Sequence, residues 1–224
     1  MSTHALYEVL RALAPAFERA SGHKLSCTFD PTRAVRRRID NGEAFDVAIV
    51  TRAVIDELVD GGAIVAETCV DLGRSGLGIS VRQGAVKPAI ATVDEFKQAL
   101  LDAASIVRSA EGASGQYFEA LLDRLDIGEA IRSKIRIGQS GRVAELVASG
   151  EAEMAVQQIS ELLPVAGTAY VGPFPDELQL YTDFAAGIAA ASQARAAAQS
   201  LIDRLAAPAA WPLFRANGLE PAAR

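Results

Sequence analysis

Small polar residues gather where predicted strands pass into predicted helices. A helix start exposes free backbone N–H groups and about half a positive charge, so several such starts facing one cleft can bind an anion. Hydroxyls at these positions also cap helices, and capping alone would explain each turn taken singly. The turns of this composition are Ser2 with Thr3 and the segments 30–33, 109–115 and 139–141. Together they favour an anion-binding cleft.

The segment 109–118 carries the sharpest of these signals. Gly112 and Gly115 would let backbone approach a ligand closely. The segment lacks the Gly-Lys-Ser/Thr ending of a phosphate-binding loop and the spacing of a dinucleotide fingerprint, so nucleotide binding is disfavoured. The alternative is an ordinary helix start that contains glycine.

Charge and composition exclude several classes of protein. The net charge of -6 does not favour a nucleic acid or an anionic membrane surface as partner. Cys27 and Cys69 stand alone in apolar alternating runs, and with only two histidines no metal site is expected. No cofactor is implied either.

Targeting signals are weak in this sequence. No stretch approaches the roughly 20 apolar residues that span a bilayer, so no membrane insertion is expected. Glu8, Arg11, Glu18 and Arg19 interrupt any signal-peptide core. The chain as written is therefore expected in the cytoplasm, although a periplasmic protein trimmed at its N-terminus would look the same.

Strands and helices alternate along the chain, which predicts an α/β fold with doubly wound, mostly parallel sheets flanked by helices. Strands are predicted at 25–29, 45–50, 77–81, 106–107, 135–137 and 154–157. Helices are predicted from residue 2 or 3 to 21 and at 32–39, 53–59, 92–103, 115–125, 143–147 and 194–205.

Two extended segments, 76–81 and 178–186, resemble crossovers between two lobes. Cutting the chain there predicts lobe I from residues 1–75 plus 187–224 and lobe II from residues 82–177, each within the usual size of a domain.

The sequence resembles the molybdate-binding protein family, the solute receptors of ABC transporters. The resemblance covers nearly the whole chain, and it implies a two-lobe, type 2 periplasmic-binding-protein-like fold with an oxyanion in the cleft. It also implies an ABC transporter permease as partner, with a first strand and an export signal upstream of Met1. The matching pieces are segments 2–6, 13–18, 21–22, 42–49, 112–115, 150–153 and 214–221.

Carried over residue by residue, the resemblance implies a set of ligand contacts. The set is Ser2 or Thr3, Thr32, the turn Gly112, Ala113 and Ser114, the helix start at Val143, and Gln157 or Gln158. Molybdate binders commonly have tyrosine where the glutamines stand, and Gly-Ser-Ser where this chain has Asp-Pro-Thr-Arg at 30–33. Both departures disfavour molybdate as the ligand.

A second branch that is similar to these receptors, the aconitate isomerases, acts on small tricarboxylates. Guanidinium groups pair with such ligands, and Arg33, Arg74 and Arg108 stand at turns or strand ends, where each could also be a solvated surface charge. An allylic isomerase needs a general base. His4 is the best-placed candidate, with Glu111 and Asp30 as weaker ones, and a capping or surface role for the histidine is the alternative.

Three functions follow from these signals. The leading interpretation is a non-enzymatic solute-binding protein for a small oxyanion or a di- or tricarboxylate. The alternative is a cytoplasmic isomerase of small unsaturated carboxylates on the same fold. A cytoplasmic sensing domain that uses the same cleft is the third.

Overall fold

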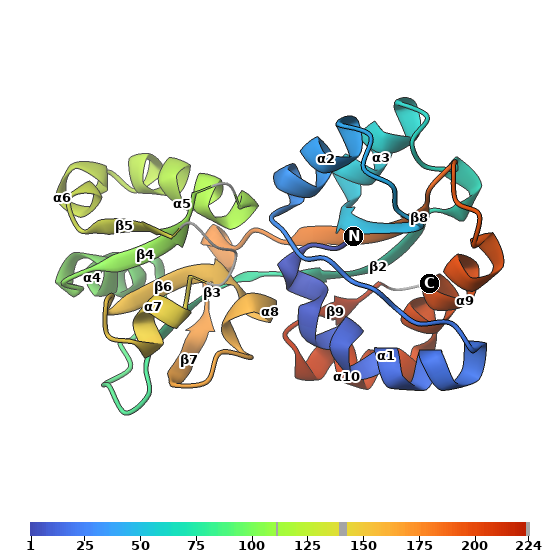
Figure 1. The fold of residues 1–224 in the computed structure, drawn as a ribbon. Helices are drawn as coiled ribbons and strands as arrows, with labels where there is room; N and C mark the ends of the chain where they lie inside the picture. The colour runs from blue at the N-terminus through green and yellow to red at the C-terminus, as the bar shows by residue number, and fades with distance from the viewer. Residues whose placement is uncertain (111, 139–142, 223–224) are drawn as a thin grey trace. The chain divides into compact units, whose positions relative to one another are not determined.

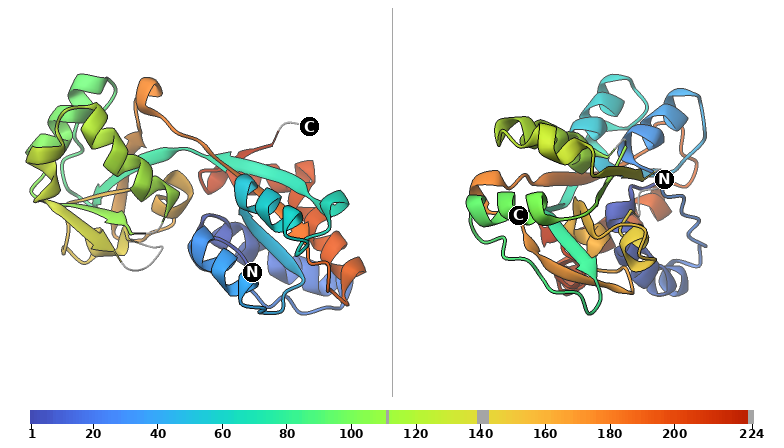
Figure 2. Two further views of the ribbon diagram at one scale, coloured as in Figure 1. Left: turned by 90° about the horizontal axis from the view of Figure 1, so that it is seen from above. Right: turned by 90° about the vertical axis from the view of Figure 1, so that its left-hand side faces the viewer.

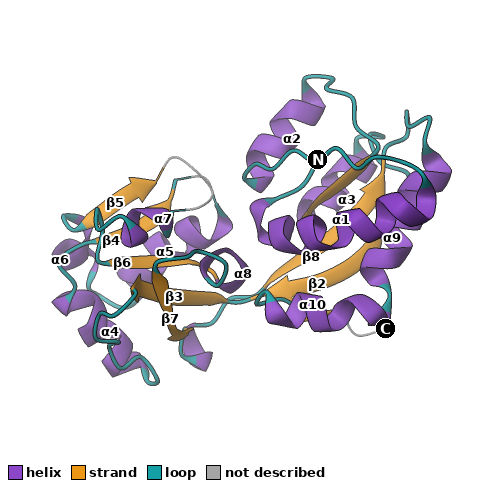
Figure 3. Cartoon of the chain, turned by 60° about the horizontal axis from the view of Figure 1, so that its bottom comes forward, coloured by secondary structure: helices purple, strands orange, loops and turns teal. Residues whose placement is uncertain are grey.

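The computed structural model describes residues 1–110, 112–138 and 143–222, and the chain divides into two compact α/β units (Figure 1). Unit 1 comprises Met1–Arg74 with Thr182–Arg224, and unit 2 comprises Ser75–Tyr181. Helices lie on both faces of the sheet in each unit (Figures 2 and 3). The lobes expected from the sequence are residues 1–75 plus 187–224 and residues 82–177.

Unit 1 is built on a four-stranded sheet in the order β1-β8-β2-β9. The pairs β1–β8 and β2–β9 are antiparallel. Its strands are β1 (Val47–Thr51), β2 (Val70–Ser75), β8 (Thr182–Ile188) and β9 (Glu220–Pro221). Its helices are η1 (His4–Leu6), α1 (Tyr7–Ser21), α2 (Thr32–Asp40), α3 (Arg52–Asp60), η2 (Ala66–Thr68), α9 (Arg195–Ala206), η4 (Pro208–Ala210) and α10 (Trp211–Ala216).

Successive side chains of β1 point to opposite faces of the sheet, so the core of unit 1 lies on both faces. Val47 and Ile49 belong to the cluster that includes α1 and α9, while Ala48 and Val50 belong to the cluster that includes α2 and α3. Successive strand residues point to opposite faces, so a strand covered on both sides reads as a continuous apolar run. Gly22, at φ 73°, ends α1, and the sequence predicts a helix that runs to residue 21.

Unit 2 is built on a five-stranded sheet in the order β5-β4-β6-β3-β7. β4 is parallel to both β5 and β6, whereas β3 is antiparallel to β6 and β7. Its strands are β3 (Leu77–Arg82), β4 (Ile106–Ser109), β5 (Ile135–Gly138), β6 (Met154–Gln158) and β7 (Thr168–Pro173). Its helices are α4 (Val93–Asp102), α5 (Ala113–Arg124), α6 (Gly128–Arg132), α7 (Glu145–Ala148), α8 (Ile159–Leu162) and η3 (Asp176–Leu178).

One detail of the predicted architecture is wrong. The sheets are mixed rather than mostly parallel, because a buried apolar run reports burial on both faces and says nothing of strand direction. The segment 76–81 lies within unit 2, largely as β3, whereas the boundary between Tyr181 and Thr182 falls inside the predicted crossover 178–186. At Gly78 a Cβ would lie 2.8 Å from the Tyr170 ring, so this glycine permits close packing inside the sheet.

Candidate functional site

In unit 1 the N-terminal residues lie extended between two other segments. Ser2 forms parallel bridges with Phe29 on one side and Ile49 on the other. The Asp30 N–H donates to the Ser2 carbonyl over 3.1 Å, and the Thr3 N–H donates to the Ile49 carbonyl over 2.9 Å. The predicted strand at 25–29 is therefore wrong in extent, since only Phe29 pairs. Parallel segments end at a common edge, so the turn after Thr3 lies beside the turn at 30–33.

These turns bring together most of the residues predicted for unit 1. Ser2 and Thr3 are 2% and 5% exposed, Thr32 is half-buried at the start of α2, and Arg33 is exposed. The Ser2 hydroxyl donates to the Thr3 carbonyl over 3.0 Å, whereas the Thr3 side chain makes no capping bond to η1. His4 follows as the first residue of η1. The capping role predicted for these two hydroxyl residues is thus wrong.

Asp30, the acid in the second turn, forms an ion pair with Arg38, which also pairs with Glu43. Hydrogen bonds to Glu43 and Asp30 raise the pKa of Arg38. The hydrogen bond from Arg38 lowers the pKa of Glu43. The turn at 30–33 therefore repels an anion less than its sequence indicates.

Arg74 does not join this group. It lies in β2, and β8 separates β2 from β1 in the sheet. Its Nε donates to Glu220 Oε2 over 2.8 Å, and both side chains are about half exposed at 49% and 55%. Arg74, which the sequence places at a strand end or turn, therefore forms a cross-strand ion pair with Glu220 of β9.

In unit 2 the parallel strands β5, β4 and β6 end at one edge of the sheet. After β4, the buried Ser109 hydroxyl accepts a hydrogen bond of 2.9 Å from the Gly112 N–H, and α5 begins at Ala113. Ser114 is 2% exposed. A Cβ at Gly115 would lie 2.1 Å from the Ser109 carbonyl oxygen. The turn from β4 into α5 is therefore packed tightly enough to require glycine.

The glutamines predicted as ligand contacts, Gln157 and Gln158, end β6 at the same edge and are 1% and 5% exposed. As neighbours in a strand they point to opposite faces. The Val143 side chain packs in the core against Gly138, which leaves only its backbone for a ligand. The predicted turn 139–141 and the base candidate Glu111 lie outside the described residues.

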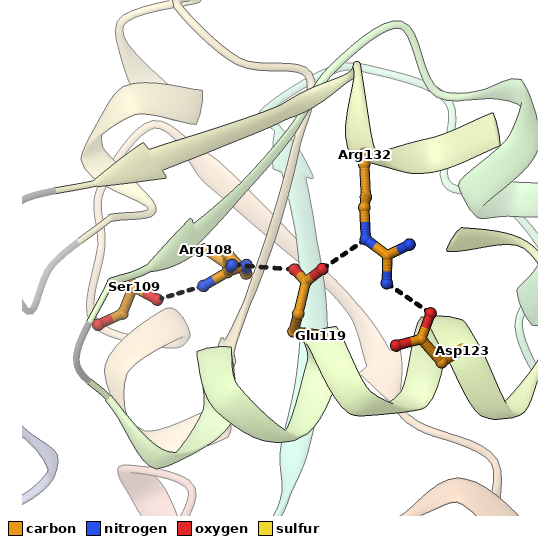
Figure 4. Close-up of polar contacts among 5 residues, drawn as sticks. All are labelled: Arg108, Ser109, Glu119, Asp123 and Arg132. Carbon is orange, nitrogen blue, oxygen red and sulfur yellow. Dashed lines mark hydrogen bonds and ion pairs between the residues drawn. The ribbon is translucent and has the colours of Figure 1, made fainter. Parts of the chain in front are cut away.

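Arg108, the third predicted arginine, is committed to a network within unit 2 (Figure 4). Its guanidinium donates to the Ser109 carbonyl over 3.1 Å and to Glu119 over 2.9 Å. Arg132 donates to the other Glu119 oxygen over 2.8 Å and also pairs with Asp123. Hydrogen bonding from Arg132 and the charge of Arg108 lower the pKa of Glu119. Arg108 thus positions the turn after β4.

Substituting Glu119→Gln is expected to lower the free energy of unfolding by about 1–2 kcal/mol at pH 7, because Arg108 loses its charged partner. The lowered pKa of Glu119 adds stability at pH values above 4.5, which is the ordinary pKa of this group, and this contribution is lost as the pH falls. Urea denaturation at pH 7 and pH 3 measures both, with Glu129→Gln, an exposed residue of α6, as control. An equal deficit at both pH values would contradict the charge-based account.

Reasoning from the sequence missed Glu161. This partly exposed residue of α8 follows the two glutamines and accepts a hydrogen bond from the Gln157 side chain. Burial raises its pKa to about 8, and the hydrogen bond from Gln157 opposes the increase. The signal that could have revealed it is an acid three residues after a strand end that already carries candidate ligand contacts.

The described residues contain no group of three or more His, Cys, Asp or Glu placed to hold a metal ion. Within the same part of the chain, no helix combines the length and the apolar character needed to cross a bilayer.

Comparison with known proteins finds matches along nearly the whole chain. A model of the family described as bacterial extracellular solute-binding protein matches residues 1–220. An aconitate isomerase of a Pseudomonas species is 35% identical over 227 residues, which cover 99% of this chain and 86% of that protein. The molybdate-binding protein ModA of Azotobacter vinelandii is 25% identical over 218 residues, covering 93% and 84%.

A solved structure extends this similarity to the fold. The periplasmic molybdate-binding protein of Azotobacter vinelandii superimposes with a TM-score of 0.81 at 17% identity, over 97% of this chain and 96% of that one.

Proposed function

Because the chain belongs to the bacterial extracellular solute-binding protein family, we propose that it binds a small organic anion of the di- or tricarboxylate class. The observation that carries the proposal is the Arg33 guanidinium, which is exposed next to Thr32 and has no ion-pair partner among the described residues. A guanidinium pairs with a carboxylate through two parallel N–H···O bonds, which a single hydroxyl cannot reproduce.

The groups near Arg33 suit such a ligand. Ser2, Thr3 and Thr32 are neutral, and Asp30 is paired with Arg38. The candidate residues of unit 2 at the ends of β4 and β6 are likewise serines, small residues and glutamines. In each unit we assign these residues to contacts with a carboxylate ligand, with neutral donors solvating carboxylate oxygens and, in unit 1, Arg33 supplying positive charge.

Removing the Arg33 guanidinium should weaken tricarboxylate binding strongly. Arg33→Ala is expected to raise Kd by about 10- to 100-fold, because a hydrogen bond to a charged group contributes about 1.5–3 kcal/mol. Isothermal titration with trans-aconitate, citrate, sulfate and molybdate measures the effect and ranks the ligands. Arg19→Ala makes the same change of charge at an exposed position of α1 and should bind as wild type.

Two outcomes would contradict this proposal. One is wild-type affinity in the Arg33→Ala variant. The other is a wild-type protein that binds none of the carboxylates, or that binds molybdate most tightly.

A second candidate function is isomerisation of a small unsaturated tricarboxylate. The observation that favours it is the identity with the Pseudomonas aconitate isomerase, which extends over 99% of this chain. Incubating the wild-type protein with trans-aconitate and following cis-aconitate by chromatography tests it directly. Absence of turnover would leave the binding function and remove the catalytic one.

A further inference from the structure

Glu161 lies in a cluster of buried polar groups at the carboxyl end of β6 in unit 2. Gln157, which is 1% exposed, donates a hydrogen bond to the Glu161 carboxyl group. The neighbouring Ser160 is 3% exposed, and its N–H donates to the Ser75 hydroxyl over 3.2 Å. The cluster therefore joins the start of α8 to the segment that leads into β3.

One group in this cluster points to a missing polar ligand. The Ser160 hydroxyl oxygen is buried and has no hydrogen-bond partner among the described residues. Buried hydroxyl groups nearly always have such a partner, because leaving one unsatisfied costs free energy. A bound molecule with oxygen atoms would satisfy the hydroxyl of Ser160, the residue that precedes Glu161 in α8.

The surroundings of Glu161 favour its neutral form. α8 contacts β3, β6 and β7. Of these strands, β6 has no titratable side chain, β7 contributes Tyr170, and β3 contributes Arg82 at its far end. Burial is the main cause of the raised pKa of Glu161, which leaves this carboxyl group titrating near pH 8. A carboxyl group that is neutral at pH 7 does not repel an anionic ligand, and it can both donate and accept a proton.

We propose that Glu161 is the proton-transfer residue for the allylic isomerisation of an unsaturated tricarboxylate. This inference rests on the isomerase activity given above as the second candidate function. Glu161 lies at the strand edge that carries Gln157 and Gln158, two of the residues assigned to the ligand.

Glu161 alone can carry out both proton transfers of the isomerisation. Its carboxylate takes a proton from the methylene carbon of the substrate, and the C–H bonding electrons delocalise over the allylic system and the adjoining carboxylate. The resulting carboxylic acid returns a proton to the other end of the allylic system. The double bond moves by one position, no electron is gained or lost, and Glu161 ends as it began. A base that titrates near the working pH suits this reaction.

The test compares wild type with Glu161→Gln, Glu161→Asp and the exposed control Glu129→Gln. Each protein is assayed for conversion of trans-aconitate, for uptake of solvent deuterium at the methylene carbon, and for aconitate affinity. Glu161→Gln should lower turnover and deuterium uptake by at least about 100-fold, with Kd changed by less than about threefold. Glu161→Asp, which retains a carboxyl group, should restore part of the activity, and Glu129→Gln should match wild type.

The pH dependence distinguishes proton transfer from a structural role. The wild-type kcat/KM should rise with pH through the pKa of Glu161, which burial raises to about 8, and level off about one pH unit above it. This rise should be absent from the residual activity of Glu161→Gln. If Glu161→Gln does not fold, the pH profile and the Glu161→Asp variant still decide the question. Turnover at the wild-type rate in Glu161→Gln would overturn the inference.

The remaining outcomes separate this inference from the functions on which it rests. A wild-type protein that binds aconitate but neither isomerises it nor exchanges its protons overturns the role of Glu161 and leaves the binding function standing. A wild-type protein that binds no carboxylate overturns both.

Discussion

Gly115→Ala is expected to destabilise unit 2 by about 3 kcal/mol and to weaken ligand binding by at least tenfold. The new Cβ would lie 2.1 Å from the Ser109 carbonyl oxygen, which is a backbone atom and cannot rotate away. The helix α5 must therefore move off the end of β4. That movement also displaces Gly112 from its hydrogen bond with the Ser109 hydroxyl.

Chemical denaturation and isothermal titration measure the two effects of Gly115→Ala. Gly172→Ala is the matched control in unit 2, because its Cβ would meet only the flexible end of Ile90 at 3.4 Å. We expect this control to change either quantity little. Wild-type stability in Gly115→Ala would show that α5 does not require the close approach, and wild-type affinity would exclude the turn from the binding site.

Glu161→Gln is expected to be more stable than wild type at alkaline pH, by several kcal/mol and at most about 5. The pKa of Glu161 rises from an ordinary value of 4.5 to about 8 on folding, and each unit corresponds to about 1.4 kcal/mol. Between these pH values the folded protein holds a proton that the unfolded chain has lost. The wild-type free energy of unfolding should therefore fall as the pH rises, and become level above pH 8.

The experiment is a series of urea denaturations from pH 5 to pH 9 on both proteins. The difference between them cancels other titrations in this range, such as that of the terminal amine, whose pKa is lowered by burial. The two proteins should be about equally stable at pH 5 and should diverge toward pH 9. A constant difference across this range would mean that the Glu161 carboxyl group is hydrated and titrates normally.

A stabilising Glu161→Gln substitution would also bear on function. Active sites retain groups that reduce stability, because the chemistry requires a side chain in an unfavourable environment. A variant that gains stability at pH 9 and loses isomerisation would connect both observations to one carboxyl group.

The sequence by itself determined the features that depend on neighbours along the chain. Alternating strands and helices predicted two α/β lobes, and the family resemblance is confirmed by the match over residues 1–220. The apolar positions of α1 face the core, and Gly22 ends that helix. At α4, Thr92 and Glu95 form the reciprocal capping bonds expected where the sequence opens a helix with Thr-Val-Asp-Glu. The helix ends at Gly22 and Thr92 involve residues within one or two helical turns.

The tertiary structure decided what depends on residues that are distant along the chain. Strand direction follows from which strands pair, and the pairing of Arg74 with Glu220 joins positions 146 apart. The ion pair with Arg38 reduces the obstacle that Asp30 presents to anion binding. The ion pair with Glu119 removes Arg108 as a candidate ligand contact. The raised pKa of Glu161 arises from desolvation where α8 packs against β3, β6 and β7. Desolvation and ion pairing depend on the atoms that packing brings near a group, and no local pattern of residue types encodes them.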